Sequence, residues 1–207
     1  MSSSETIGSY LARLAAGRPT PGGGATGALQ AAQGAALLGM AARFTTGEGY
    51  EDRAERMERI AARADEIVQA ALQVSDDDQA AFGAVADAYA LPAGSDEEQA
   101  ERSEAIQRAL RGAVVPPREL ARIAAEVIGL CSDVVDAVNP NVLSDVAAAA
   151  EAARAAAATA LVTLEINLRS VEDEDVREGL RSDIHDAETA VETAAGVTRR
   201  VRDALGG

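Results

Sequence analysis

One aspartate interrupts an apolar helix face, at a position where its carboxylate could act on a substrate. Asp78 ends the run Asp76-Asp77-Asp78 and lies at helical spacing between Val74 and Phe82. A carboxylate at a core position is costly unless it is paired or hydrogen-bonded, and functional sites are where proteins tolerate that cost. Two readings stay open: Asp78 is a catalytic acid or base, or it is a structural carboxylate bonded to a helix end or an arginine.

A second set of polar residues follows a turn later in the chain. Asn139-Pro140-Asn141 precedes Ser144 and Asp145, and Asn141 or Ser144 is a natural cap for the helix that begins here. Asn167 falls on roughly the same helix face as Asp145, and small residues lie between them. A small-residue face predicts either a close helix contact or the wall of a pocket.

A glycine-rich loop is the third candidate. Pro19-Thr20-Pro21-Gly22-Gly23-Gly24 precedes a helix of small residues. The first N–H groups of a helix have no partner within it, so they can bind an anion or a carbonyl oxygen. No Gly-Lys-Ser/Thr follows, which excludes the Walker phosphate-binding loop. The alternative is a tight loop before a helix that packs closely on its neighbour.

Other kinds of chemistry have few residues to work with. Cys131 is the only cysteine and lies in an apolar helical stretch, where we expect a buried small hydrophobe. His185 is the only histidine and lies in a polar stretch, where we expect solvent exposure. No disulfide within the chain, zinc cluster or nucleophilic triad can be assembled from this set, so we expect no bound metal.

The elements that must position these groups are helices, because strong helix formers dominate and alternating strand patterns are missing. Breaks at proline and glycine divide a single predicted domain, residues 1–207, into about six helices. Their predicted spans are 4–17, 24–46, 51–90, 95–137, 141–168 and 170–204. Pro116-Pro117 should kink or split the fourth, since proline deletes a helix hydrogen bond and clashes with the preceding turn.

The third predicted helix has the clearest periodicity. Its apolar face is formed by Ile60, Ala64, Ile67, Ala71, Val74, Asp78, Phe82, Val85 and Tyr89. Long helices with few large side chains have little to bury alone, and alanine-lined faces let helices approach closely. The sequence therefore predicts an all-α bundle that assembles as a homodimer, with a monomeric bundle as the alternative.

Charge excludes several classes of protein. Acidic residues number 34 against 19 basic ones, every one an arginine, for a net charge of −15. An acidic surface with 2% aromatic residues argues against nucleic-acid binding, and no run approaches the roughly 20 apolar residues of a membrane span. With one cysteine and no signal-peptide pattern, the expected location is the cytoplasm. The even acidity without lysine predicts a halophilic source, and a GC-rich genome that favours Arg and Ala codons is the alternative.

Nine short motifs follow one another in an order that is specific as a set. They are Pro19-Thr20-Pro21-Gly22-Gly23-Gly24, Met40-Ala41-Ala42-Arg43-Phe44-Thr45, Gly49-Tyr50-Glu51-Asp52, Asp76-Asp77-Asp78 with Ala81-Phe82, Leu91-Pro92, Ala105-Ile106-Gln107, Val115-Pro116, Asn139-Pro140-Asn141 with Ser144-Asp145, and Ile166-Asn167-Leu168. In these motifs the chain resembles the cyclodeaminase/cyclohydrolase family of folate enzymes, the C-terminal half of formiminotransferase-cyclodeaminase. The resemblance runs from about residue 7 to about residue 200.

This resemblance implies an all-helical homodimer that acts on tetrahydrofolate derivatives and needs no cofactor beyond that substrate. One family reaction hydrolyses 5,10-methenyltetrahydrofolate to 10-formyltetrahydrofolate. The other cyclises 5-formiminotetrahydrofolate to the methenyl form and releases ammonia. The resemblance implies Asp78 and Asp145 as the acid/base or cation-stabilising pair. The implied substrate-binding residues are Pro21, Gly22, Gly23, Gly24, Arg43, Asn141, Ser144 and Asn167.

The chain departs from the family pattern at two places. Ala25 stands where relatives commonly have serine, and the acidic loop Thr46-Gly47-Glu48-Gly49-Tyr50 stands where relatives tend to carry a lysine pair. Binding of a polyglutamate tail on the substrate would then depend on Arg43 or Arg53, or would involve neither side chain. Because the chain stands alone, cyclohydrolase is the expected reaction and cyclodeaminase the alternative. A non-catalytic helical assembly module is the alternative from another class.

Overall fold

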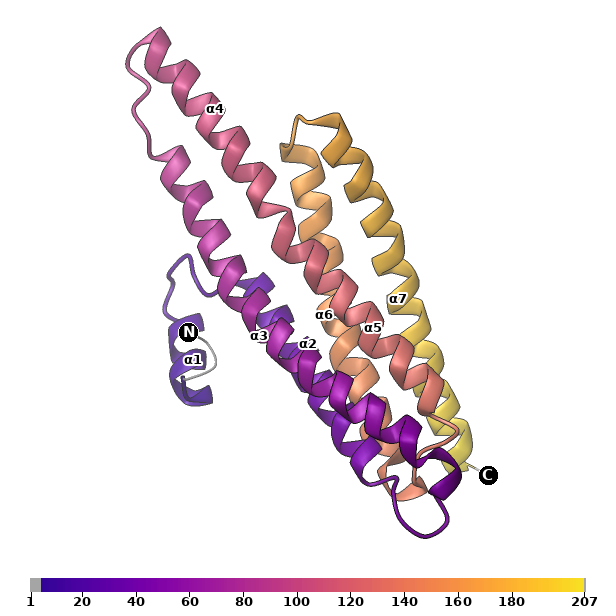
Figure 1. Ribbon diagram of the computed structural model, residues 1–207. Helices are drawn as coiled ribbons and strands as arrows, with labels where there is room; N and C mark the ends of the chain where they lie inside the picture. Colours follow the sequence, from indigo (N-terminus) through magenta and orange to yellow (C-terminus); the bar gives the residue numbers. More distant parts are fainter. Residues whose placement is uncertain (1–4, 207) are drawn as a thin grey trace.

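The computed structural model describes residues 5–206, and all of the regular structure in this range is helical (Figure 1). The α-helices are α1 (Ile7–Leu14), α2 (Gly23–Arg43), α3 (Ala54–Tyr89), α4 (Asp96–Ala113), α5 (Val115–Val134), α6 (Leu143–Ser170) and α7 (Glu174–Gly206). Two short 3-10 helices, η2 (Glu51–Arg53) and η3 (Pro140–Val142), precede α3 and α6. The predicted all-α class is confirmed.

One predicted helix is two helices in the structure. The segment expected over 95–137 divides at Val114, so that α4 ends at Ala113 and α5 begins at Val115. Pro116 and Pro117 occupy the first turn of α5 and are buried. Proline is tolerated there because the first N–H groups of a helix have no partner within it. The prolines thus start a helix that continues nearly in the direction of α4 (Figure 1).

The five long helices that contain most of the core form two layers. In one layer α5 packs between α3 and α7, and in the other α2 packs against α6. Helix α2 also contacts α3 and α5, and α6 also contacts α5 and α7, so each fits between two helices of the first layer. Figure 1 shows α2 and α6 behind α3 and α5. The outer side of the α2–α6 layer faces away from α3, α5 and α7, and α1 lies beside its α2 part.

Helices α2 and α6 run antiparallel and very close together because small residues line their contact. A Cβ atom on Gly34 would lie 2.8 Å from the Ala149 carbonyl oxygen and 3.3 Å from the Ala153 nitrogen. One on Gly27 would lie 2.9 Å from Leu120 and 3.0 Å from Thr159. The neighbours of Gly34 are backbone atoms of α6, which cannot rotate away, so the spacing of the two helices depends most on this glycine.

We expect Gly34→Ala to destabilise the protein by about 1–3 kcal/mol, because the new methyl group overpacks the α2–α6 contact. Gly129→Ala is the matched control, since Gly129 is also helical but a Cβ there meets nothing within 4 Å. That control should be neutral or gain up to about 1 kcal/mol from helix propensity. Urea unfolding of both variants measures the difference. Equal stabilities would show that α2 and α6 are less tightly packed than described.

The apolar face predicted along α3 is only half correct. Its first part is buried, from Ile60 to Val74, but Phe82 is 51% exposed and Tyr89 is 52% exposed. The reason is the position of α2, which begins at Gly23, opposite Asp78. Beyond that level α3 has α4 beside it and no α2 beneath it, and the α3–α4 hairpin projects past the α6–α7 turn (Figure 1).

Side chains fix the starts of several helices. Ser95 and Glu98 form a capping box at α4, and Asp173 accepts hydrogen bonds from the Asp175 and Val176 N–H groups before α7. The cap near α6 differs from the prediction. Asn139, rather than Asn141 or Ser144, accepts the N–H, and it caps the short η3. The turn therefore begins two residues earlier than the sequence indicates.

Two other predictions concern single residues. Cys131 is fully buried, and this burial raises the pKa of its thiol to about 12, as expected of an inert core residue. His185 is exposed on α7. Among residues 5–206, one helical stretch, Pro140–Ser170, is apolar and long enough to cross a membrane by length and composition. It contains α6, which packs against α2, α5 and α7.

Candidate functional site

The Asp78 carboxylate lies on the first turn of α2. Its Oδ2 accepts a hydrogen bond of 3.0 Å from the Ala25 N–H, one of the N–H groups that have no partner within the helix. Helix α3 supplies the carboxylate and the glycine loop supplies the helix start, so the first and third sequence candidates meet here. The N–H groups of Gly23 and Gly24 donate no hydrogen bond to any residue within 5–206.

Gly24 is required for this close approach. A Cβ on Gly24 would lie 2.5 Å from Asp78 Cγ and 2.8 Å from Oδ2, and closer still to Oδ1. No side chain larger than hydrogen fits while the carboxylate stays in place. Of the three glycines in the loop, Gly24 alone has this contact, because a Cβ on Gly23 meets nothing within 4 Å and one on Gly22 meets only Pro19.

The surroundings of Asp78 favour its protonated form more than water does. Partial burial raises the pKa of the carboxyl above its ordinary value, and the hydrogen bond from Ala25 lowers it by less. The side chain is half-buried, so it keeps access to solvent or to a ligand. A carboxyl with a raised pKa changes protonation state closer to neutral pH, which suits proton transfer.

Helix α1 lies beside this turn and is tied to it through polar side chains. The Tyr10 hydroxyl lies 3.4 Å from Thr26 Oγ1, which in turn donates to the Gly22 carbonyl oxygen at 2.9 Å. At the end of α1, Arg13 donates to Gln79 Oε1 at 3.1 Å, one residue beyond Asp78. These contacts hold α1 against both α2 and α3.

A cavity of about 520 Å³ opens between α1, α2 and α3, beginning at Thr26. Its walls are largely apolar, as in most sites for small organic ligands. Gln30 lines it, and the Gln30 Oε1 atom is shielded from solvent with no hydrogen-bond partner within the described residues. Sequence reasoning missed Tyr10 and Gln30. The available signal for Gln30 was a pair of glutamines, Gln30 and Gln33, within an otherwise small or apolar helix that is free of charge up to Arg43.

The second sequence candidate lies at the other end of α2. The side-chain amide of Asn139 donates a hydrogen bond to the Phe44 carbonyl oxygen, so the Asn139–Asp145 segment packs at the C-terminal end of α2. Asn141 and Ser144 are exposed there, and Asp145 is half-buried. Arg43 ends α2 at this level and forms an ion pair with Asp65. From Gly24 to Arg43 the helix rises about 28 Å, so one chain does not bring Asp145 to Asp78.

Asn167 lies nearer the Asp78 end. Gly27 packs against Thr159 on the antiparallel α6, which places Asn167 beyond the level of the glycine loop. Its side-chain amide donates to the Ala113 carbonyl oxygen at 3.2 Å, at the junction of α4 and α5. In this structure Asn167 therefore holds a helix junction.

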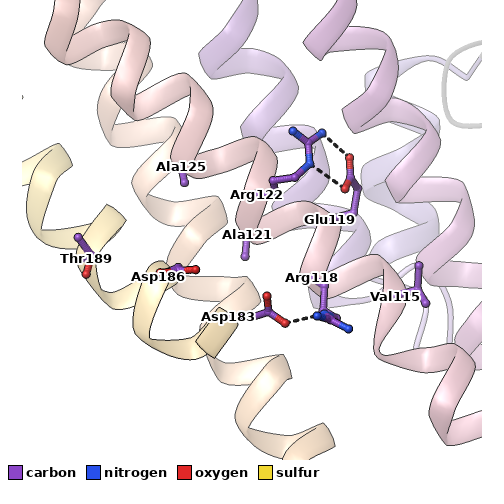
Figure 2. A pocket seen from close by; sticks show the side chains of 9 residues that line it. All are labelled: Val115, Arg118, Glu119, Ala121, Arg122, Ala125, Asp183, Asp186 and Thr189. Carbon is purple, nitrogen blue, oxygen red and sulfur yellow. Dashed lines mark hydrogen bonds and ion pairs between the residues drawn. The ribbon is translucent and has the colours of Figure 1, made fainter. Parts of the chain in front are cut away.

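A larger cavity, about 660 Å³, lies elsewhere, in a groove between α5 and α7 (Figure 2). Four of its five charged side chains, all but Asp186, are paired with each other. Arg118 forms an ion pair with Asp183, and Arg122 binds Glu119 through two hydrogen bonds. None of the sequence candidates lines this groove or the cavity between α1, α2 and α3. That cavity, however, begins at Thr26, the residue after the Ala25 whose N–H binds Asp78. We therefore take the Asp78 turn and the neighbouring cavity as the candidate site.

Comparison with known proteins identifies the family. The family model for formiminotransferase-cyclodeaminase matches residues 6–186. The chain belongs to the formiminotransferase-cyclodeaminase family. It is 35% identical to a methenyltetrahydrofolate cyclohydrolase from Methylorubrum extorquens over 174 residues, which cover 84% of each chain.

Other members of the formiminotransferase-cyclodeaminase family differ in length. The rat formimidoyltransferase-cyclodeaminase is 30% identical over 177 residues, which are 85% of this chain and 33% of that protein. The crystal structure of formiminotetrahydrofolate cyclodeaminase from Thermotoga maritima superposes with a TM-score of 0.88 over all of both chains at 26% identity. The helical fold described above is thus that of a solved family member.

Proposed function

We propose that the protein is a methenyltetrahydrofolate cyclohydrolase, which acts in the cytoplasm and needs no cofactor beyond its folate substrate. The observation that supports this most is the half-buried Asp78 carboxylate on the first turn of α2, the turn at which Thr26 begins the wall of a largely apolar cavity of about 520 Å³. The relative with this activity covers 84% of the chain. The methenyl substrate carries a cation delocalised over N5, the bridging carbon and N10, which an adjacent carboxylate stabilises.

Asp78 would supply the proton transfers of this hydrolysis. As the carboxylate it takes a proton from a water molecule, whose oxygen attacks the bridging carbon. The bond between that carbon and N5 then breaks, N5 keeps the electron pair, and the protonated Asp78 gives it a proton. The new hydroxyl group on the carbon loses its proton to solvent as its oxygen becomes the formyl carbonyl, so the reaction of the cation with water releases one proton overall. The formyl group remains on N10. The raised pKa of Asp78 suits a group that must both accept and release a proton.

The methenyl chromophore tests this proposal directly. Added protein should speed the loss of methenyltetrahydrofolate absorbance well above the rate in buffer, with 10-formyltetrahydrofolate as the product. A rate equal to that in buffer, with no folate binding by calorimetry, would instead favour the non-catalytic assembly module.

Cyclodeaminase activity is the second candidate, because the superposed Thermotoga protein bears that name. Here N10 attacks the carbon of the protonated formimino group and loses its own proton to the Asp78 carboxylate. Asp78 then gives a proton to the amino nitrogen on that carbon, the bond from the carbon to this nitrogen breaks, and ammonia departs to leave the methenyl cation. Presenting 5-formiminotetrahydrofolate separates the two enzymes. Appearance of the methenyl chromophore with release of ammonia would identify the cyclodeaminase.

We also propose that two copies assemble through the outer side of the α2–α6 layer, here called the outer face. On α2 the outer face comprises Thr26, Gln30, Gln33, Ala36, Leu37 and Met40, and on α6 it comprises Asp145, Ala148, Ala152, Ala155, Thr159, Val162 and Ile166. Val162 is 54% exposed and Ile166 57% exposed. Asp145 is its only charged residue, whereas 26% of the whole chain is charged. Two chains of charge −15 repel each other, so an uncharged surface is where they can meet.

A charge placed on the outer face tests the homodimer. Ala36→Glu should convert the dimer to a monomer in light scattering, because it buries an unpaired carboxylate in each subunit. Ala195→Glu is the matched control, since both alanines are exposed on helices and Ala195 lies on α7, away from the outer face. A monomeric wild-type protein at micromolar concentration would contradict the proposal.

The acidic surface carries a further expectation, which follows if the protein is adapted to high salt. We expect the midpoint of thermal unfolding to rise between 0.1 M and 2 M KCl, because salt screens the repulsion within a chain of charge −15. The exposed ion pairs weaken as well, but each contributes little to stability. Calorimetry measures the shift. A falling midpoint would favour genomic composition as the cause of the acidity.

A further inference from the structure

One buried acceptor in the cavity beside the Asp78 turn has no donor. Gln30 lies on α2, one helical turn beyond Thr26, and lines the cavity between α1, α2 and α3. The Gln30 Oε1 atom is shielded from solvent and accepts no hydrogen bond from any residue within 5–206. Burying an acceptor without a donor lowers stability. Such an atom in a cavity therefore indicates a donor that arrives with a ligand.

The other residues of the cavity select the kind of group that carries this donor. Most of them are leucine, isoleucine or alanine, and Ile7 and Leu11 of α1 are exposed there. Glu5 is the one charged residue among the described residues of its lining, and it is already paired with Arg13 through two hydrogen bonds. The carboxylates at the glutamate end of a folate would meet no cation in this lining. The uncharged pterin ring suits the apolar walls.

The position of Gln30 along α2 matches the shape of a bound pterin. The bridging carbon of the substrate must lie at the Asp78 carboxylate, on the first turn of α2. Gln30 is six residues beyond Gly24, which is about 9 Å along the helix axis. The 2-amino group of the pterin is a hydrogen-bond donor, and it lies at the end of the fused rings away from the bridging carbon. A ring that lies along α2 brings this group to the level of Gln30.

We infer that Gln30 recognises the pterin ring of the substrate, through a hydrogen bond from the 2-amino group to Gln30 Oε1. The apolar walls hold the ring, and Gln30 fixes which way round it lies. Gln30 determines specificity and is not a catalytic residue, because it contacts the end of the ring away from the reacting carbon. The inference rests on the proposed function, since the bridging carbon is placed at Asp78.

Gln30→Met separates this role from a structural one. Methionine has a similar length and no amide oxygen, so the variant should be at least as stable as wild type in urea unfolding. KM for methenyltetrahydrofolate should rise about tenfold, the loss of one hydrogen bond. Because ground state and transition state lose it alike, kcat should change by less than about twofold. Gln73→Met is the matched control and should keep the wild-type KM, since Gln73 is exposed on α3 and donates to Asp77.

Calorimetry with two ligands identifies the group that Gln30 contacts. The wild-type protein should bind tetrahydrofolate about tenfold more tightly than 2-desaminotetrahydrofolate, in which hydrogen replaces the amino group. Gln30→Met should bind both ligands equally, because the variant lacks the acceptor and the analogue lacks the donor of the same hydrogen bond.

The outcomes separate this inference from the proposed function. An unchanged KM in Gln30→Met, or the same preference for the amino group in both proteins, would overturn the inference and leave the proposed function standing. A variant that is less stable than wild type and has a lower kcat would overturn it in favour of a structural role. Wild-type protein that binds with this preference but hydrolyses no methenyltetrahydrofolate would remove the proposed function and support the Gln30 contact. Wild-type protein that binds neither ligand would overturn both.

Discussion

Asp78→Asn should lower kcat of methenyltetrahydrofolate hydrolysis by about 10²–10⁴-fold, the usual cost of removing an acid/base group. Asparagine keeps the size of the side chain, and its carbonyl oxygen can still accept the Ala25 N–H, so the geometry of the turn should persist. The matched control is Asp77→Asn. Asp77 is exposed and accepts a hydrogen bond from Gln73, away from the site. Stopped absorbance assays at saturating substrate measure both variants.

The pH dependence of the wild-type enzyme should report the same carboxyl. The base acts when deprotonated, so activity should fall as pH falls through the pKa of Asp78, at a higher pH than an ordinary aspartate would give. Because the pKa of Asp78 is raised in the folded protein, its ionised carboxylate lowers the free energy of unfolding. This destabilisation disappears as the pH falls through the raised pKa. Asp78→Asn should therefore be at least as stable as wild type near neutral pH. An active variant, or an inactive one that is unfolded, would remove the support for Asp78 as the base.

Gly24→Ala should lower activity by about 10–100-fold while the protein stays folded, because a misplaced catalytic group is costly even at a displacement of about 1 Å. The new Cβ would overlap the Asp78 carboxylate, which must turn away and give up the Ala25 N–H. Losing that hydrogen bond should cost about 1 kcal/mol of stability. Steady-state kinetics and urea unfolding measure the two effects.

Gly83→Ala is the control for this substitution. Gly83 lies on α3 close to Asp78 in sequence, and a Cβ there meets nothing within 4 Å. It should keep full activity and fold at least as stably as wild type. Equal activity in Gly24→Ala and Gly83→Ala would mean that the reaction does not depend on the position of the Asp78 carboxylate.

Local patterns were enough to predict the class of fold. Helix formers, apolar periodicity and proline or glycine breaks are properties of neighbouring residues, and they located the helices within a few residues. The failure on α3 had a non-local cause. Phe82 and Tyr89 continue the apolar spacing of Val74, but their exposure is decided by where α2 starts. The start of α2 is encoded some 50 residues earlier in the chain, at the glycine loop.

The site could be predicted in part for the same reason. The position of Asp78 within an apolar face left two readings open, a catalytic carboxyl or a structural one bonded to a helix end or an arginine, and the structure shows a bond to a helix end. Which helix end it contacts depends on packing, as does the cavity next to Tyr10 and Gln30. The distance between Asp78 and Asp145 could not be predicted from the motifs either. The order of the motifs along the chain shows that both aspartates are present, but not that they lie near opposite ends of α2.

The contact between Gly24 and Asp78 links two positions that lie far apart in the chain, and it adjoins the hydrogen bond from Ala25 to the same carboxylate, across a separation of 53 residues. During evolution neither position can change freely without the other. A lineage that gains any side chain at position 24 loses the room for the carboxylate at 78, and the selective value of that glycine disappears once the carboxylate is lost. In a comparison of many family members, the two positions should therefore vary together. Chains that lack both are the ones in which to look for a protein that has kept this bundle but abandoned its chemistry.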